Sequence, residues 1–97
     1  MTPHNPPHPG EFIHAVYLEP FGMSSRALAG HLNVAPATLH RILKQQRSIN
    51  AEMALRLSMV IGRSPESWLA MQQAYDLWVA KQAIELSGVK RLKLIAL

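Results

Sequence analysis

Two short amphipathic helical patterns, joined by a two-residue turn, constrain the fold of this chain more than any other feature. The first covers residues 23–32, the second covers residues 35–44, and Asn33 and Val34 separate them. Each has an apolar stripe at helical spacing, made of Leu28, Ala29 and Leu32 in the first and of Leu39, Ile42 and Leu43 in the second. Helices this short bury their stripes by packing together, so the pattern predicts a helix-turn-helix.

The same part of the chain carries charge of one sign. No Asp or Glu occurs between residues 20 and 51, a window that contains Arg26, Arg41, Lys44 and Arg47. The whole chain has ten basic and six acidic residues and a formal net charge of +4. A surface that contacts phosphates requires such segregation, because a carboxylate beside a phosphate offsets the gain from a lysine or arginine. The window therefore predicts a surface that faces a polyanion.

Length and composition exclude several classes of protein. With 97 residues, 48% of them hydrophobic, the chain is long enough for one small domain with its own core. It has no cysteine, which excludes disulfides and thiolate metal sites. No apolar stretch is as long as a membrane span, and the N-terminal residues lack the basic and apolar stretches of a secretory signal, so none is expected. The histidines and acids are scattered, so we expect a protein that is not an enzyme and holds no metal or cofactor.

Proline and glycine mark the boundaries on the N-terminal side. Residues 1–9 contain four prolines and are expected to form a flexible tail. The apolar positions of residues 10–18 fit one face of a helix, which the sequence Pro-Phe-Gly at residues 20–22 is expected to end. Ser24 then stands where a helix N-cap belongs, directly before the predicted helix pair.

Two further helices follow the pair. Asn50 is the predicted N-cap of a helix that runs to about Ile61 and ends at Gly62. Ser64 and Pro65 stand in the order of an N-cap and a first helical residue, so they begin the next helix. That helix is expected to be long, reaching about residue 86.

The end of the chain has no clear pattern. Residues 89–97 form a C-terminal extension whose apolar spacing fits a strand as well as a helix. Residues 10–88 are predicted to form one all-α domain of five helices, with the helix-turn-helix in the middle and a long C-terminal helix.

The outward face of the second helix in the pair is the candidate site. In a helix-turn-helix this helix lies in the major groove, where its early residues meet base edges. Arg41 is the expected direct reader, since a guanidinium bonds both O6 and N7 of guanine. Thr38 and His40 supply polar groups, whereas Pro36 and Ala37 supply apolar contacts to thymine methyl groups.

Three more residues are predicted to contact the DNA backbone. Lys44 and Arg47 lie at and beyond the end of the second helix, where phosphates are within reach. Ser25, together with the N–H groups at the start of the first helix, is expected to bind a phosphate from the other side. Each cation taken singly also fits a solvated helix face, but their grouping with the turn and the missing acids favours DNA contact.

The long helix is apolar on more than one side, which favours contact with a second copy of the chain. Trp68, Tyr75, Trp78 and Val79 are the predicted interface residues, and residues 89–97 are a candidate part of the same interface. A tryptophan at helical spacing from a leucine is also typical of a core. A dimer would place two reading helices about one turn of DNA, roughly 34 Å, apart, as a palindromic site requires.

Several short motifs resemble one family over about residues 8–80. They are His8-Pro9-Gly10-Glu11, Leu18-Glu19-Pro20, the helix-turn-helix, Ile49, Ala54-Leu55-Arg56-Leu57, and the spaced set Trp68, Leu69, Gln72, Tyr75, Asp76 and Leu77. In these motifs the chain resembles the HigA (VapI-like) antitoxins, which are Xre/Cro-type helix-turn-helix proteins with a lambda-repressor-like bundle. The resemblance implies a cytoplasmic homodimer that binds double-stranded DNA at a palindromic operator and represses its own operon. It also implies a partner, a HigB-like (RelE-like) toxin that cleaves mRNA and that the antitoxin neutralises.

The chain departs from the family pattern directly after the second helix of the pair. Family members have Gly-Lys-Arg there, whereas this chain has Gln45-Gln46-Arg47. Glycine favours the left-handed conformation that ends a helix, so its absence predicts a slightly longer helix. Two other functions fit the same fold. One is a stand-alone Xre-family transcriptional regulator without a toxin, and the other is a protein-interaction module that has lost DNA binding.

Overall fold

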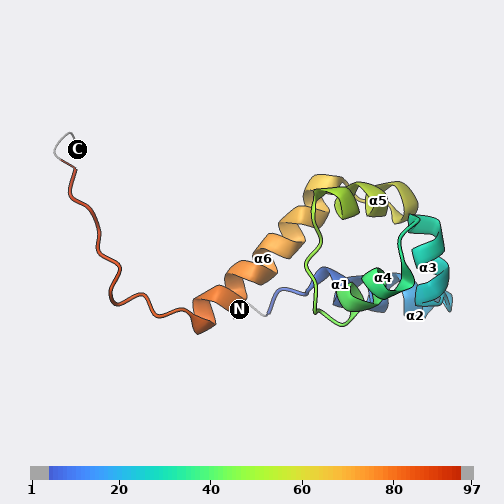
Figure 1. Cartoon of the computed structure of the whole chain (residues 1–97), viewed down its shortest axis with the longest axis horizontal. Helices are drawn as coiled ribbons and strands as arrows, with labels where there is room; N and C mark the ends of the chain where they lie inside the picture. Colours follow the sequence, from blue (N-terminus) through green and yellow to red (C-terminus); the bar gives the residue numbers. More distant parts are fainter. Residues whose placement is uncertain (1–4, 95–97) are drawn as a thin grey trace.

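The computed structural model describes residues 5–94, and every regular element within them is helical. The elements are α1 (Pro9–Ile13), η1 (His14–Leu18), α2 (Glu19–Phe21), α3 (Ser25–Leu32), α4 (Pro36–Leu43), α5 (Ala51–Ile61) and α6 (Pro65–Ala83). Because α1, η1 and α2 follow one another without a break, residues 5–94 contain five helical segments (Figure 1). The predicted all-α, five-helix class is confirmed.

The first segment begins earlier than its sequence pattern predicts. His8 is the N-cap of α1, and its Nδ1 accepts a hydrogen bond of 2.9 Å from the Gly10 N–H. Pro9 occupies the first turn, where its missing N–H costs nothing. His8 and Pro9 are both buried, so they belong to the folded domain, and the predicted boundary at Gly10 lies two residues too late. Residues 1–4 of the predicted tail lie outside the described residues.

The same segment passes through Pro20 and does not end there. The η1 turn is π-helical, and the N–H of Glu19 donates to the carbonyl of His14, five residues back. This wider turn comes directly before Pro20, which has no N–H and would clash with a carbonyl in a regular α-helix. The segment ends at Gly22, which adopts the left-handed conformation with φ +62°.

The helix pair α3 and α4 has the capping that its sequence predicts. Ser24 accepts a hydrogen bond of 3.1 Å from the Ala27 N–H at the start of α3. Asn33 ends α3 in the left-handed conformation with φ 56°, which asparagine tolerates better than most residues. Arg56 of α5 then donates to the carbonyl oxygens of Leu32 (2.9 Å) and Asn33 (3.3 Å). The turn is therefore held by α5 as well as by its own residues.

Close packing of α1 against α4 depends on Gly10. Any side chain there would overlap the carbonyl group of Ile42 and the Cα atom of Leu43. The backbone of α1 therefore touches the end of α4, and it sets where α4 sits relative to the rest of the bundle. Leu39 and Ile42 of α4 are buried in the common core, whereas Leu43 is half-buried.

The start of α6 completes the core. Trp68 is 0% exposed, and its Nε1–H donates to the carbonyl of Gly62 at 2.8 Å. Its ring packs edge-on against Phe12 at 5.9 Å between centroids, and the Arg63 guanidinium lies 5.5 Å from the ring centroid. Trp68 therefore has no surface left for a second copy. Its assignment to a dimer interface is wrong, because the core interpretation of the same spacing holds.

The helix α6 then leaves the bundle. It ends at Ala83, three residues earlier than predicted, and Ile84 turns to an extended conformation. Residues 84–94 continue as an exposed arm away from the bundle, as Figure 1 shows. Residues 89–94 are neither strand nor helix, and residues 95–97 lie outside the described part of the chain. No helix within residues 5–94 combines the length and the apolar character needed to cross a bilayer.

Candidate nucleic-acid interface

The predicted reading residues lie together on the outer face of α4. Pro36, Ala37, His40 and Arg41 are all exposed. They line one hollow of about 490 Å³ together with Ser25 and Arg26 of α3 and with Gln46. The structure thus joins the first turn of α3 to the free face of α4. A phosphate group and a base edge can be contacted from this one surface.

Thr38 lies at the edge of that face. It is half-buried, and it lines a second, smaller cleft with Arg47, Glu52 and Arg56. Glu52 is already paired with Arg56 at 2.8 Å, so its charge is largely offset where it comes near the face. Thr38 is the predicted reader with the least exposed surface.

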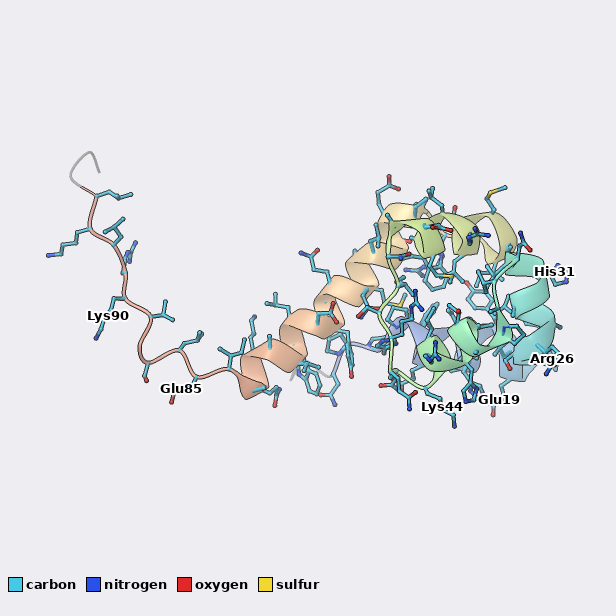
Figure 2. All side chains as sticks on the ribbon, viewed as in Figure 1. Glu19, Arg26, His31, Lys44, Glu85 and Lys90 are labelled. Carbon is cyan, nitrogen blue, oxygen red and sulfur yellow. The ribbon has the colours of Figure 1, made fainter. Side chains whose placement is uncertain are left out.

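Cations on the α3–α4 side have no acidic partner. Within residues 5–94, the ion pair between Arg56 and Glu52 is the only one, so no carboxylate pairs with Arg26, Arg41 or Lys44. Figure 2 shows that Arg26 and Lys44 point away from the bundle. The acid-free sequence window has become an unpaired positive surface, which attracts polyanions at long range.

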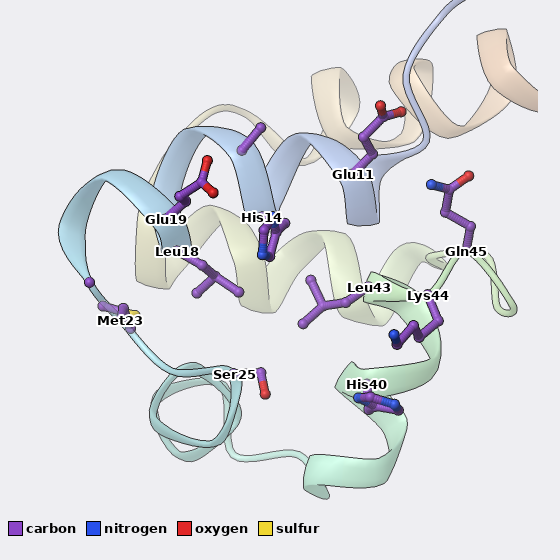
Figure 3. Close-up of a pocket in the computed structure, with 12 residues that line it drawn as sticks. Glu11, His14, Leu18, Glu19, Met23, Ser25, His40, Leu43, Lys44 and Gln45 are labelled. Atoms are coloured by element: carbon purple, nitrogen blue, oxygen red, sulfur yellow. The ribbon is translucent and has the colours of Figure 1, made fainter.

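A larger groove of about 750 Å³ is lined by residues of the first helical segment, the start of α3 and the end of α4. Figure 3 shows Glu11, His14 and Glu19 along one wall of the groove, with His40 and Lys44 on the other side. The two acids lie on the α1–α2 side only. A phosphate chain on this part of the molecule is therefore expected to follow the α3–α4 side.

The start of α3 offers backbone donors for a phosphate. Ser24 uses its side chain to cap the Ala27 N–H and its carbonyl to accept from Leu28. The first N–H groups of a helix, here those of Ser25 and Arg26, have no intrahelical partner. Ser25 is half-buried and lines both the hollow and the groove described above. Its contact with a phosphate stays a prediction.

The end of α4 differs from its sequence-based prediction. The helix stops at Leu43, and Gln45 adopts the left-handed conformation with φ 62°. Gln45 N–H donates to Ile42 O at 2.9 Å and Gln46 N–H donates to Arg41 O at 2.8 Å, which is a Schellman motif. The expected extension of the helix is therefore wrong. A glutamine takes the strained conformation because two hydrogen bonds hold it there.

Two residues that support this loop were not singled out for a role by sequence reasoning. Gln72 of α6 accepts a hydrogen bond of 2.9 Å from the Ile49 N–H, beyond the end of α4. The ring of His8 packs edge-on against Tyr75 at 4.9 Å. Burial lowers the pKa of His8 below its usual 6.5, while Asp76 and the backbone of Arg47 act in the opposite direction. Both residues occur in the family motifs, which was the available signal.

The other predicted interface residues of α6 keep some free surface. Tyr75 and Trp78 are half-buried, and their rings lie 6.4 Å apart. Val79 is exposed, as is the neighbouring Leu77. Within residues 5–94, no cluster of three or more histidines and acids is arranged to hold a metal ion.

Comparison with known proteins places this fold. A helix-turn-helix family model matches residues 16–68. Virulence-associated protein I of Dichelobacter nodosus is 48% identical over 75 residues, which are 77% of this chain and 69% of that protein. The uncharacterized HTH-type transcriptional regulator YddM of Escherichia coli is 38% identical over 91% of this chain and 93% of its own length. Antitoxin HigA-1 of Vibrio cholerae is 35% identical over 79% of this chain and 72% of its own length.

Solved structures of antitoxins have the same architecture. Antitoxin GraA is 41% identical with a TM-score of 0.86, covering 93% of this chain and 100% of that one. GraA in complex with its operator is 36% identical with a TM-score of 0.84 and covers 97% of both chains. Pseudomonas aeruginosa antitoxin HigA with the higBA promoter is 33% identical with a TM-score of 0.81, covering 93% of this chain and 98% of that one. This chain belongs to the Xre-type helix-turn-helix proteins of the HigA (VapI-like) antitoxin family.

Proposed function

We propose that the chain is the DNA-binding antitoxin of a type II, HigBA-like toxin–antitoxin system. It neutralises a HigB-like toxin that cleaves mRNA, and it represses its own operon by binding a palindromic operator. The observation that carries the proposal is the free, acid-free face of α4 with Ser25 beside it. The relatives solved on an operator or a promoter match nearly the whole chain, α4 included.

On the operator, α4 lies in the major groove. Arg41 bonds a guanine, and Pro36, Ala37, Thr38 and His40 contact neighbouring base edges or methyl groups. These five residues decide which sequence is bound.

The remaining contacts go to the DNA backbone. Lys44 and Arg47 neutralise phosphates at the far end of α4, and Ser25 receives a phosphate at the start of α3. These contacts supply affinity for any duplex and make binding depend steeply on salt.

The protein acts as a dimer in this proposal. Tyr75, Trp78 and Val79 contact the second copy, and the extension at residues 89–97 adds to the interface. Leu92 is 76% exposed and Leu94 is 54% exposed on the arm, so apolar surface there is available for burial. A dimer brings two copies of α4 onto successive turns of the DNA. We also propose that the protein works in the cytoplasm and has no catalytic role.

One alternative has its own support. YddM, a relative that matches over 93% of its length, is described as a transcriptional regulator and not as an antitoxin. A stand-alone regulator would use the same face of α4 and the same dimer but would have no toxin. The two functions differ in the product of the neighbouring gene.

Coexpression with that neighbouring gene tests the proposal. The antitoxin is expected to copurify with the neighbour's product and to restore growth that this product alone arrests. If the neighbour is harmless and does not bind while the protein still shifts its own promoter, the stand-alone regulator is correct.

A binding titration separates both functions from a module without DNA binding. Affinity for the promoter duplex is measured between about 50 and 200 mM salt, where six or more phosphate contacts lower it by about a thousandfold or more. Weak binding without a salt slope would contradict both DNA-binding functions.

A further inference from the structure

The loop between α4 and α5 contains Arg47, which is proposed to contact a phosphate. A residue outside the loop holds it in position. Gln45 and Gln46 are bonded back to α4, and Asn50 caps α5. Between them, within the described residues, the N–H groups of residues 47–49 make one hydrogen bond, from Ile49 to Gln72 Oε1 at 2.9 Å. The middle of the loop is therefore positioned by α6, 23 residues further along the chain.

Both the oxygen and the nitrogen of the Gln72 side-chain amide make hydrogen bonds. Gln72 is 4% exposed, and with His8 it is one of two buried polar side chains among the described residues. Its Oε1 accepts from Ile49, and its Nε2 donates to Asp76 Oδ1 at 2.9 Å, one turn further along α6. The bond to Asp76 orients the amide, so the oxygen and not the nitrogen faces the loop.

The loop also borders a small cleft that it shares with α1 and α6. Arg47 lines a cleft of about 120 Å³ together with His8, Gln72, Tyr75 and Asp76. His8 packs on Tyr75 and caps α1, so α1, the loop and α6 meet at this cleft. Arg47 lies two residues before the Ile49 tether. The tether therefore restricts where the Arg47 backbone can lie.

We propose that Gln72 is a positioning residue for DNA binding, which holds the 47–49 loop through Ile49 so that Arg47 meets a phosphate. The proposal rests on the proposed DNA-binding function and deepens it, because it ties the phosphate contact to α6. Without the tether the loop must be ordered when DNA binds, and that ordering cost weakens the complex. Gln72 itself touches no DNA.

A double-mutant cycle tests this. Gln72→Met removes the hydrogen bonds at similar volume, and we expect operator affinity to fall by about tenfold and the salt slope to shrink by about one phosphate. Arg47→Ala is expected to have a similar effect. Because the two residues serve one contact, the double variant should bind within about twofold of Arg47→Ala alone. The matched control combines Gln72→Met with Arg41→Ala on the body of α4, where the losses should multiply.

Two further variants keep the test decisive. Gln72→Asn shortens the side chain by one methylene and leaves it polar, so it replaces Gln72→Met if that variant does not fold, with the same expected losses. The pair Gln72→Glu with Asp76→Asn keeps an oxygen for Ile49 and reverses the second hydrogen bond, so it should restore affinity to within about twofold.

The outcomes separate this inference from the function on which it depends. If the wild-type protein does not bind the promoter duplex, the proposed function fails. If it binds, and Arg47→Ala weakens binding, but Gln72→Met only lowers the melting temperature, the positioning role is overturned. Losses for Gln72→Met and Arg47→Ala that multiply fully would overturn it as well, since independent sites behave in that way.

Discussion

The helices α4 and α6 both begin with a proline, but they divide their residues between core and surface in different ways. In α4 one stripe, Leu39 and Ile42, is buried, and the opposite face is free along the whole helix. In α6 the buried residues Trp68 and Gln72 lie in the first half, while Leu77 and Val79 further on are exposed. A helix with one stripe has one buried and one free face. In a helix with apolar residues on every side, the residues inside the bundle are buried, and those beyond its end stay exposed.

The difference matters for function. The free face of α4 is exposed and carries Arg41 and, at its end, Lys44, which leaves it available to DNA. The free part of α6 exposes Leu77 and Val79 among polar residues, and these apolar side chains favour a protein partner. The loop that follows α4 is hydrogen-bonded to Gln72 of α6, so the two helices are not independent.

The largest effect is expected when a substitution in the first half of α6 is compared with one in the second half. Trp68→Ala empties a fully buried site and is expected to destabilise the monomer by about 3–5 kcal/mol. Trp78→Ala lies beyond the core and should leave monomer stability nearly unchanged while weakening the dimer. Thermal melts at low protein concentration report the first quantity, and sedimentation over a concentration series reports the second. Equal destabilisation by both variants would contradict the division of α6.

A second test asks how far α4 depends on a helix outside the pair. Gly10→Ala puts a methyl group into the Ile42 carbonyl, so we expect a loss of about 3 kcal/mol of unfolding free energy. The matched control is Gly30→Ala in α3, which meets no atom within 4 Å and should stabilise the helix by about 0.5–1 kcal/mol. Urea titrations of both variants measure the difference. A harmless Gly10→Ala would show that α1 does not position α4.

The third test concerns the free face of α4. Arg41→Ala is expected to cost about 1–3 kcal/mol on the operator and to relax the preference at one base pair. Lys44→Ala should weaken all duplexes alike and reduce the salt slope by about one. Competition between operator and random duplex separates the two. If both variants keep the wild-type profile, α4 does not dock as proposed.

A smaller effect is expected at the end of α4. Gln45 holds a left-handed conformation with φ 62°, which costs a non-glycine residue about 1 kcal/mol. Gln45→Gly removes that strain but adds freedom to the unfolded chain, which offsets about 0.4–1 kcal/mol of the gain, so the net stabilisation should be no more than about 0.5 kcal/mol. Denaturant unfolding measures it. A loss of stability would mean that the Gln45 side chain contributes more than its strain costs.

The smallest expected effect is a pH dependence at His8. Its pKa is lowered by burial, so the unfolded chain binds a proton more readily than the folded one. The stability linked to His8 is complete above the unfolded pKa of about 6.5 and declines as pH falls below it. His8→Asn keeps a capping group and should flatten the melting temperature between about pH 7 and pH 5. An unchanged slope would assign the dependence to other groups.

Local rules explain why the helix-turn-helix could be predicted. Ser24, Asn50 and Ser64 act as N-caps as their sequence contexts indicate, since a cap and the helix it starts are only a few residues apart. The apolar residues of α4 lie on one face of the helix, so only one orientation of the helix buries them. The spacing of Trp68 fitted both a core and a dimer interface, and the choice depended on whether Phe12 of the first helical segment packs against it.

The sequence by itself determined the helix pair, its orientation with Arg41 outward, and the absence of acids within it. These follow from periodicity, capping and charge, which act within a few residues. Only the tertiary structure decided that His8 and Pro9 are buried, that Gly10 touches α4, and that Gln72 holds the loop before α5. Each of these depends on segments distant in sequence, and close packing together with hydrogen-bond satisfaction selects such contacts only once the chain is folded.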